Sequence, residues 1–237
     1  MPTPAPPTQQ DNKRGLFISC EGGDGCGKTT QARLLGEWLG PALHKEVLLT
    51  REPGGTPLGQ QIRQLVLHGD DMGPHAEALL YAADRAHHVH SLVKPALERD
   101  TIVITDRYFD SSIAYQSGGR ELTATEVRNL SMWATENLVP DLTILFDIDP
   151  KVGASRFTDA PDRLERAGAD FHQRTRETYL HNAAQEPDRW IVIDGHGTIE
   201  EVAQLTQQAV RVRLQEKFAH YAHALTTNTF TTPESTV

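Results

Sequence analysis

A lysine and two threonines close a run of glycines between residues 22 and 30, and residues of these types at this spacing bind phosphate. Gly22, Gly27, Lys28 and Thr29 fit the pattern G-x-x-x-x-G-K-[ST]. Glycines let the backbone turn tightly and aim its N–H groups at phosphate oxygens. Lys28 would reach the β- and γ-phosphates of a nucleoside triphosphate, and the Thr29 hydroxyl would hold Mg²⁺. The pattern predicts a site for ATP.

The segments on both sides of these glycines are those that the pattern requires. An apolar run, LFISC, precedes them and predicts a buried strand, and QARLLGEWL follows them with helical spacing. The alternative is a glycine-rich turn with a chance lysine, and the agreement of strand, spacing and helix disfavours it. The residues predicted to bind ATP are Gly22, Gly23, Asp24, Gly25, Cys26, Gly27, Lys28, Thr29 and Thr30.

Four more apolar runs predict strands, at residues 47–50, 101–106, 142–149 and 190–194. Helical patterns at residues 57–67 and 74–99 lie between them, and this alternation predicts an α/β fold with a parallel sheet and right-handed crossovers. Charged residues follow the strands, in the loop REPGGT at 51–56 and at Asp106 and Arg107. Ligands of open α/β sheets bind at the carboxyl ends of the strands, so these side chains are candidates for a site.

The composition suits one cytoplasmic domain. The chain has 237 residues and a formal net charge of −9, which argues against broad binding to nucleic acid or to an anionic membrane. No segment reads as a targeting signal or a membrane span. We expect the domain to occupy residues 15–217, with disordered tails at 1–14 and 218–237. Cys20 and Cys26 are expected to be reduced thiols.

Residues 150–168 are polar and contain Arg156, Arg163 and Arg166, and we refer to them as the lid. The interpretation as a mobile lid over the site competes with that of an ordinary solvated loop. The histidines at 87, 88 and 90 do not have the spacing of a metal-ligand set, and we expect them on a solvated helix face.

Five motifs together resemble bacterial thymidylate kinases: EGGDGCGKTTQ, TREPGGTPLG, YAADR, DRYFDSSIAYQ and DRLE. The resemblance runs from about Leu16 to about Val212 with the motifs in the family's order. It implies a P-loop NTPase fold, a five-stranded parallel sheet wrapped by helices with a short lid. It also implies transfer of the γ-phosphoryl group of ATP to dTMP with Mg²⁺, giving dTDP and ADP for dTTP biosynthesis, in a homodimer.

The resemblance assigns the dTMP site residue by residue. Asp24 would bind the sugar 3′-hydroxyl, and Arg51 and Arg107 would clamp the phosphate, which suits planar guanidinium groups at strand ends. Tyr81 would stack on thymine, and its spacing of four from Arg85 places both on one helix face. Tyr115 would crowd the 2′ position of a ribose. The further residues that would bind or line the base are Arg63, Arg85, Ser112 and Gln116.

The chain departs from the family in its catalytic cation. Some members carry an arginine in the phosphate loop, where this chain has Asp24, Gly25 and Cys26. The cation is therefore expected from the lid, with Arg163 as first choice and Arg156 as second. The predicted catalytic residues are Lys28, Asp106, Arg107 and Arg163, and the predicted Mg²⁺ ligands are Thr29 and Asp106.

Two other functions remain open at this point. A deoxynucleoside kinase would share the phosphate loop but needs a carboxylate to deprotonate a 5′-hydroxyl, and Glu52 is in position for that role. A catalytically silent nucleotide-binding regulator is the other, and the set Lys28, Thr29, Asp106 and Arg107 counts against it. Cys26 is a candidate reactive thiolate because of Lys28 and the helix dipole, or else a small buried residue that fills the loop.

Overall fold

The computed structural model contains one five-stranded, entirely parallel sheet, as the sequence predicted. The structure describes residues 14–118, 122–156, 163–164, 166 and 168–226. The strands are β1 (Phe17–Glu21), β2 (Val47–Arg51), β3 (Ile102–Asp106), β4 (Leu142–Asp147) and β5 (Trp190–Asp194), in the spatial order β2-β3-β1-β4-β5. The chain builds β2 and β3 on one side of β1, then β4 and β5 on the other. The loop after β1 thus lies where the winding reverses, which is where such sheets bind ligands.

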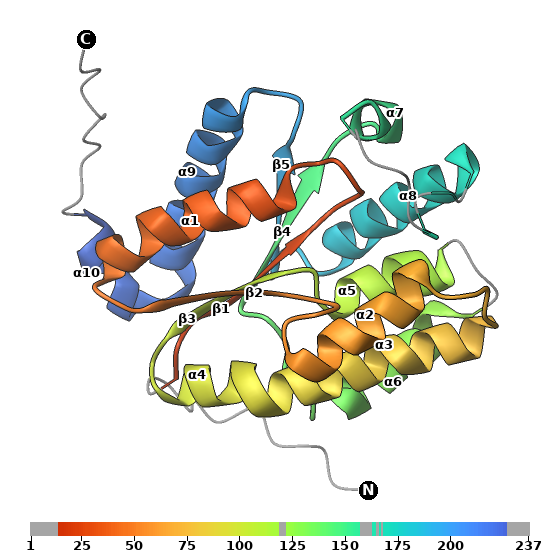
Figure 1. Cartoon of the computed structure of the whole chain (residues 1–237). Coiled ribbons are helices and arrows are strands. Elements are labelled where there is room, and N and C mark those ends of the chain that lie inside the picture. The colour runs from red at the N-terminus through yellow and green to blue at the C-terminus, as the bar shows by residue number, and fades with distance from the viewer. Residues whose placement is uncertain (1–13, 119–121, 157–162, 165, 167, 227–237) are drawn as a thin grey trace, which may run out of the picture.

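Alternation along β1 separates two apolar layers. Leu16, Ile18 and Cys20 point into one core cluster, which contains side chains of α1 (Lys28–Leu43) and α9 (Ile199–Lys217). Phe17 points into the opposite cluster, which contains side chains of α3 (Pro74–His88), α5 (Phe109–Ser112) and α6 (Ala124–Ala134). Figure 1 shows the resulting three layers, with helices on both faces of the sheet. Helices cover most of both faces, which explains why the strands read as apolar runs. Side chains on the two edge strands stay partly exposed, with Leu49 on β2 at 45% and Val192 on β5 at 49%.

The helices begin where the sequence supplies turn or capping residues. Thr56 accepts a hydrogen bond from Gly59 N at 3.0 Å before Pro57 starts α2, and Thr123 forms a capping box with Glu126 before α6. The helices before β4 are α1 (Lys28–Leu43), α2 (Pro57–His68), α3 (Pro74–His88), α4 (Lys94–Glu98), α5 (Phe109–Ser112) and α6 (Ala124–Ala134). Those after it are α7 (Pro150–Ala154), α8 (Ala169–Gln185), α9 (Ile199–Lys217) and α10 (Ala219–Thr226).

Two π-helical segments continue helices of the first half. The segment η1 (Val89–Val93) joins α3 to α4, so residues 74–98 form one unbroken helical rod, as the sequence predicted for 74–99. The segment η2 (Ile113–Ser117) extends α5 and contains Tyr115 and Gln116. Wide π-turns are frequent at functional sites, and η2 lies beside the cavities described below.

The helix α10 corrects the prediction that residues 218–237 are a disordered tail. Tyr221 is 5% exposed and Leu225 is fully buried, and both belong to the cluster formed with α1 and α9. The ordered domain therefore extends to Thr226. The N-terminal tail expected at 1–14 lies outside the described residues apart from Arg14, which pairs with Asp141 at 2.6 Å.

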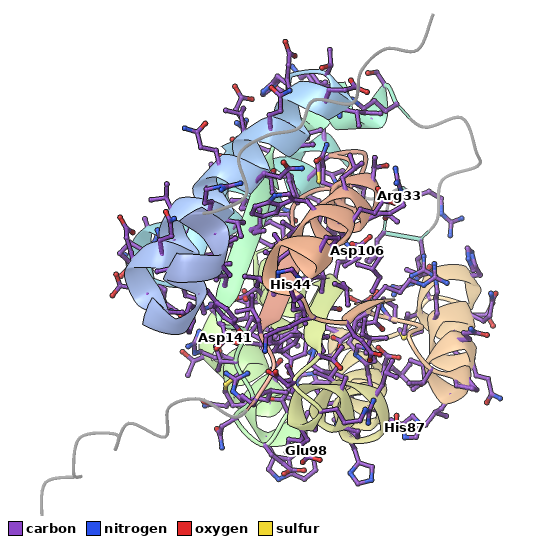
Figure 2. All side chains as sticks on the ribbon, turned by 90° about the vertical axis from the view of Figure 1, so that its left-hand side faces the viewer. Arg33, His44, His87, Glu98, Asp106 and Asp141 are labelled. Atoms are coloured by element: carbon purple, nitrogen blue, oxygen red, sulfur yellow. The ribbon has the colours of Figure 1, made fainter. Side chains whose placement is uncertain are left out.

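Because every strand runs in the same direction, the ends of the sheet differ chemically. Asp141 precedes β4 at the amino edge, and Asp106 ends β3 at the carboxyl edge (Figure 2). The strand register places Cys20, Arg51 and Asp106 next to one another at this carboxyl edge. The predicted site residues that follow β1, β2 and β3 are thereby brought together.

Candidate active site

The loop between β1 and α1 has the backbone that its glycines permit. Gly22, Gly25 and Gly27 have φ values of 141°, 74° and 88°, which side chains larger than glycine rarely adopt. A Cβ atom on Gly25 would also lie 2.3 Å from the carbonyl oxygen of Gly153, so α7 packs directly on the loop. The glycines therefore give the loop both its turn and its contact with the start of the lid.

Lys28 and Thr29, at the start of α1, lie beside Asp106 at the end of β3 and supply the polar groups next to this loop. The Lys28 Nζ atom donates to the carbonyl oxygen of Gly23 at 2.8 Å and lies 3.6 Å from Cys26 Sγ. The Thr29 hydroxyl donates to a carboxylate oxygen of Asp106. Cys26 is only 3% exposed, which favours the interpretation that it fills the loop. Its reactivity stays a prediction.

Arg107 connects the phosphate loop to the rest of the site. Its guanidinium donates to the carboxylate of Asp24, to the carbonyl oxygen of Gly22 at 3.1 Å and to the hydroxyl of Tyr115 at 3.2 Å. It also lies 4.9 Å from the centre of the Tyr115 ring. Arg107 has a φ of 69°, and its N–H group donates to the carbonyl oxygen of Cys20 at 2.9 Å, so the turn after β3 aims the side chain back over β1.

Arg107 and Asp24 each stabilise the charged form of the other. Burial acts to lower the pKa of Arg107, but Tyr115 and Asp24 outweigh it and the pKa rises. Burial acts to raise the pKa of Asp24, but Arg107 and Lys28 outweigh it and the pKa falls. The Tyr115 hydroxyl donates to Asp24 at 2.8 Å. Both members of the pair are therefore ionised at neutral pH.

Two adjoining cavities open at this point. The first, of about 440 Å³, is lined by the phosphate loop and by charged side chains from the strand ends and the lid. The second, of about 130 Å³, lies toward α3 and η2 and has aromatic and polar walls. We call them the phosphate cavity and the base cavity. Asp24, Glu52, Arg63 and Arg107 line both.

The structure places almost every predicted site residue on one of these cavities. The phosphate cavity is lined by Asp24, Gly25, Gly27, Lys28, Thr29, Thr30, Arg51, Glu52, Arg63, Asp106, Arg107 and Arg156. The base cavity is lined by Asp24, Glu52, Pro53, Arg63, Leu67, Tyr81, Arg85, Arg107, Tyr108, Ser111, Ser112, Tyr115, Gln116 and Leu164. Arg51 is exposed, and Arg63 donates to the carbonyl oxygen of Pro53 at 3.1 Å.

Glu52 is fully engaged in a buried cluster. One carboxylate oxygen accepts from Arg85 Nε at 2.7 Å, and the other lies 2.8 Å from His88 Nδ1. Arg85 also donates to Ser112 Oγ at 3.0 Å. His88 is completely buried, which corrects the expectation of a solvated helix face. Neither oxygen of Glu52 is available to deprotonate a substrate hydroxyl in this arrangement.

The two lid arginines lie in different places. Arg156 reaches the phosphate loop, where it donates to the carbonyl oxygens of Gly25 at 3.2 Å and Gly195 at 3.4 Å. Arg163 is buried, pairs with Glu77 on α3 and donates to the carbonyl oxygen of Val66 at 2.9 Å. Arg163 is thus beside the base cavity and not among the residues that line the phosphate cavity. The catalytic assignment of Arg163 stays a prediction, and these contacts favour Arg156.

Sequence reasoning missed Glu21, the last residue of β1. It is fully buried and accepts hydrogen bonds from Tyr108 N at 2.8 Å, Ser111 Oγ at 2.6 Å and the Tyr179 hydroxyl at 3.1 Å. Burial, with a smaller contribution from Asp110, raises the pKa of Glu21. Its signal in the sequence is a single charge at the end of an apolar run. Glu21 fixes Ser111 and Tyr179, which both contact Arg107.

The described residues show neither a metal-ligand cluster nor a membrane-spanning helix. Across the described ranges, no three histidine, cysteine or acidic side chains are grouped as ligands for a metal ion. None of the helices in that part of the chain is long and apolar enough to cross a membrane.

Comparisons with known proteins agree with this geometry. The family model for thymidylate kinase matches residues 20–206. The thymidylate kinase of Bifidobacterium longum subsp. infantis is 54% identical over 210 residues, which cover 86% of this chain and 90% of that protein. That of Leifsonia xyli subsp. xyli is 56% identical over 196 residues, covering 81% and 92%. The crystal structure of thymidylate kinase from Ehrlichia chaffeensis superposes with a TM-score of 0.70 at 31% identity, covering 84% and 99%.

Proposed function

The chain belongs to the thymidylate kinase family, and from this membership we infer that it transfers the γ-phosphoryl group of ATP to dTMP, giving dTDP and ADP in dTTP biosynthesis. It is an ATP-dependent nucleoside monophosphate kinase. The observation that carries this function is the pair of adjoining cavities that share Arg107 and Asp24. One has the groups that hold a triphosphate, and the other has the shape and walls that hold a nucleoside.

On the donor side, the phosphate loop from Gly22 to Thr30 binds the triphosphate of ATP. Its N–H groups and the start of α1 attract the phosphate oxygens, and Lys28 neutralises charge on the β- and γ-phosphates. In the structure Lys28 Nζ is held by the carbonyl oxygen of Gly23. This contact keeps the ammonium at the cavity, where a phosphate oxygen can replace or join the carbonyl.

On the acceptor side, Arg107 and Arg51 hold the phosphate of dTMP. Arg107 stands between the two cavities and is a permanent cation, which supports a role in bringing donor and acceptor phosphates together. Asp24 binds the sugar 3′-hydroxyl, and Tyr115 stands against the 2′ position. Tyr81 stacks on the base. The polar edge of the base contacts Arg85, Ser112 and Gln116, and Arg63 lies near the sugar and phosphate.

Mg²⁺ fits the residues at the phosphate cavity. Thr29 Oγ1 and the Asp106 carboxylate are hydrogen-bonded and both line it, and oxygen ligands of this kind suit a hard cation. Magnesium ions in phosphate-transferring enzymes take few protein ligands and use substrate oxygens for the rest, so a site of two protein ligands is sufficient. When bound, the ion would neutralise charge on the phosphates.

The reaction requires positioning and charge neutralisation. The attacking atom is an oxygen of the dTMP phosphate, which is anionic at neutral pH, so no general base has to remove a proton. Lys28, Arg107 and a lid arginine hold the two phosphates in line and stabilise the charge that spreads over the transferring group. The engagement of Glu52 by Arg85 and His88 disfavours a deoxynucleoside kinase, which needs a free base there.

We also propose a homodimer that acts in the cytoplasm and has no nucleic-acid or membrane partner. Both cysteines are free thiols, as expected in a reducing compartment. The helix α3 contacts both α2 and α6. Each of these three helices exposes a large apolar side chain: Leu65 on α2 (53% exposed), Leu79 on α3 (57%) and Trp133 on α6 (81%). Such a surface supports association with a second copy.

A coupled assay of ADP release tests the function. The protein is incubated with ATP, Mg²⁺ and one acceptor at a time. The acceptors are a panel of nucleoside monophosphates and, as a further separate acceptor, thymidine. We expect turnover with dTMP and none with thymidine. Turnover with thymidine alone would identify a deoxynucleoside kinase. ATP binding without turnover on any acceptor would support the alternative of a catalytically silent nucleotide-binding regulator.

A further inference from the structure

The base cavity contains an amide whose orientation is set by a neighbouring carboxylate. Gln116 Nε2 donates to Glu77 Oε1 at 3.0 Å, and the two residues are 2% and 0% exposed. A carboxylate only accepts hydrogen bonds, so Gln116 must turn its NH₂ group toward Glu77. Its carbonyl oxygen has no hydrogen-bond partner within the described part of the chain and is not sealed from the cavity that Gln116 lines. Gln116 therefore presents an acceptor to that cavity.

Glu77 is in turn held by a cation from the lid. Its other carboxylate oxygen, Oε2, forms a buried ion pair with Arg163 Nη2. Arg163 is fixed there by two backbone contacts, from its Nε to Val66 O at 2.9 Å and from its backbone N–H to Leu67 O at 3.1 Å. The oxygen that faces Arg163 has to be an acceptor, because a guanidinium only donates. The direction of every hydrogen bond from Arg163 to Gln116 is thus determined.

A second polar group on the same helical stretch can supply a donor. Ser112 precedes Gln116 by four residues, so the two side chains share a face. Arg85 Nη2 donates to Ser112 Oγ at 3.0 Å, which uses a lone pair and leaves the hydroxyl hydrogen free to donate. Arg85 cannot turn away, because its Nε is paired with Glu52. The cavity therefore offers one acceptor and one donor next to each other.

We propose that Glu77, held by Arg163, selects the class of pyrimidine by fixing Gln116 as an acceptor. The proposal rests on the proposed function and deepens it. Thymine and uracil carry an N–H donor at position 3 and a carbonyl acceptor at position 4, which match Gln116 and Ser112. Cytosine has an acceptor at position 3, which would face the Gln116 oxygen, so this contact becomes unfavourable. Ser112 can donate to a carbonyl or accept from an amino group at position 4, so the discrimination rests on Gln116. Glu77 is a positioning residue that touches the base only through Gln116.

The variant Glu77→Gln tests this directly, because the geometry predicts a reversal and not a simple loss. The new amide has one oxygen and one NH₂ group, and the oxygen must face Arg163. Its NH₂ group then faces Gln116, which has to turn its own carbonyl toward residue 77 and present NH₂ to the cavity. We expect the ratio of kcat/KM for dTMP over dCMP to fall about a hundredfold or more, since buried mismatched polar groups discriminate strongly.

Two comparisons separate this effect from general damage. The ratio for dTMP over dUMP should stay unchanged in Glu77→Gln, because these bases share the same polar edge and differ by a methyl group. In the double variant Glu77→Gln/Arg163→Met, Arg163 no longer dictates the orientation of residue 77, so the preference for dTMP over dCMP should partly return. A lid or structural role of Arg163 would change turnover with all three acceptors equally.

The outcomes are distinct. A wild-type protein without dTMP turnover would refute the proposed function itself. An active wild type together with a folded Glu77→Gln variant that keeps the wild-type ratio of dTMP to dCMP would overturn the inference about Glu77. If the variant does not fold, a crystal structure of the wild type with dTMP decides. Gln116 must then bridge Glu77 and position 3 of the base, and a base edge directed elsewhere refutes the proposal.

Discussion

Arg107 is the residue on which the two cavities depend most. Its guanidinium contacts Asp24, Tyr115, Tyr179, Ser111 and the carbonyl oxygen of Gly22. An ammonium group has one charged centre and cannot satisfy partners on two sides in the same way. Arg107→Lys should therefore weaken dTMP binding and lower the rate, roughly tenfold or more, while ATP binding survives. Steady-state kinetics and nucleotide titrations measure both effects.

The control for Arg107 is Arg33→Lys, an equally conservative change at an exposed helical pair with Glu37. It should leave the kinetics unaltered, because exposed pairs of this kind contribute little. Kinetics of Arg107→Lys that match those of this control would remove Arg107 from the acceptor site.

The lid arginines give a second prediction at the residue scale. Arg156 contacts the phosphate loop, whereas Arg163 is paired with Glu77. Arg156→Ala should lower kcat far more than it weakens dTMP binding, because the charge is needed chiefly in the transition state. Arg163→Ala has that signature only if Arg163 leaves Glu77 during turnover. If neither variant shows it, the lid supplies no catalytic cation.

The raised pKa of Asp84 predicts how the free energy of unfolding depends on pH. Burial, and next the charge of Glu52, raises the pKa of Asp84 from 3.8 to about 6, and its Oδ2 atom has no hydrogen-bond partner among the described residues. Because the folded-state pKa exceeds the unfolded one, the stability that this group contributes is fully present below about pH 4 and is lost as pH rises through 6. A shift of about two pKa units corresponds to a loss on the order of 3 kcal/mol.

Asp84→Asn removes this titration. Urea unfolding at pH values from 4 to 8 should show that the variant gains free energy of unfolding relative to the wild type as pH rises, with a plateau above about pH 7. Asp70→Asn, at an exposed position of the same charge type, serves as the control and should show no such trend. A flat difference across the range for Asp84→Asn would mean that the carboxyl group is not desolvated as described.

Sequence motifs located the cavity residues well but could not give their partners. Arg85 and Glu52 are 33 positions apart, and only the packing of α3 on the loop after β2 makes them a buried pair. The same packing buries His88. The sequence predicted a solvated face for it, because the histidines at 87, 88 and 90 lack the spacing of a metal-ligand set. Glu21 was missed for a related reason, since the groups that hold it, Ser111 and Tyr179, come from α5 and α8.

At the scale of elements, α10 shows where the sequence was misread. Phe218, Tyr221 and Leu225 follow one another at spacings of three and four, which is the pattern of an amphipathic helix. The threonine-rich composition of the residues that follow predicts a disordered tail and obscures this pattern. The five strands were predicted because buried parallel strands leave long apolar runs, whereas a short helix leaves only three apolar positions as its signal.

Truncation of the chain tests the contribution of α10. Ending it after Lys217 removes Tyr221 and Leu225 from a cluster in which they are 5% and 0% exposed. Burial of two such side chains contributes about 3 kcal/mol or more, so the melting temperature should fall by roughly 6–12 °C. Ending the chain after Thr226 instead keeps α10 and should leave the melting temperature unchanged. Equal stability of the two truncations would show that α10 adds nothing.

At the scale of the whole molecule, the order of strands explains why one edge of the sheet holds the chemistry. The ends of β1, β2 and β3 lie side by side, which brings the phosphate loop, Arg51 and Asp106 to one place. The helices α2 and α3 lie away from α1 (Figure 1). They supply Arg63, Leu67, Tyr81 and Arg85 to the walls of the base cavity. The outer faces of these same helices carry the exposed apolar side chains, so association there would lie next to the base cavity.

The last prediction concerns this association. Leu79→Glu and Leu65→Glu place charges on the exposed surface of α3 and α2, and a buried unpaired charge strongly opposes an apolar interface. Sedimentation velocity should show a dimer for the wild type and a monomer for each variant at micromolar concentration. Val212→Glu is the matched control on the distant helix α9, where Val212 is 47% exposed. A dimer that survives both leucine changes and dissociates with Val212→Glu would place the interface on α9. A wild type that sediments as a monomer over the whole concentration range would refute the dimer itself.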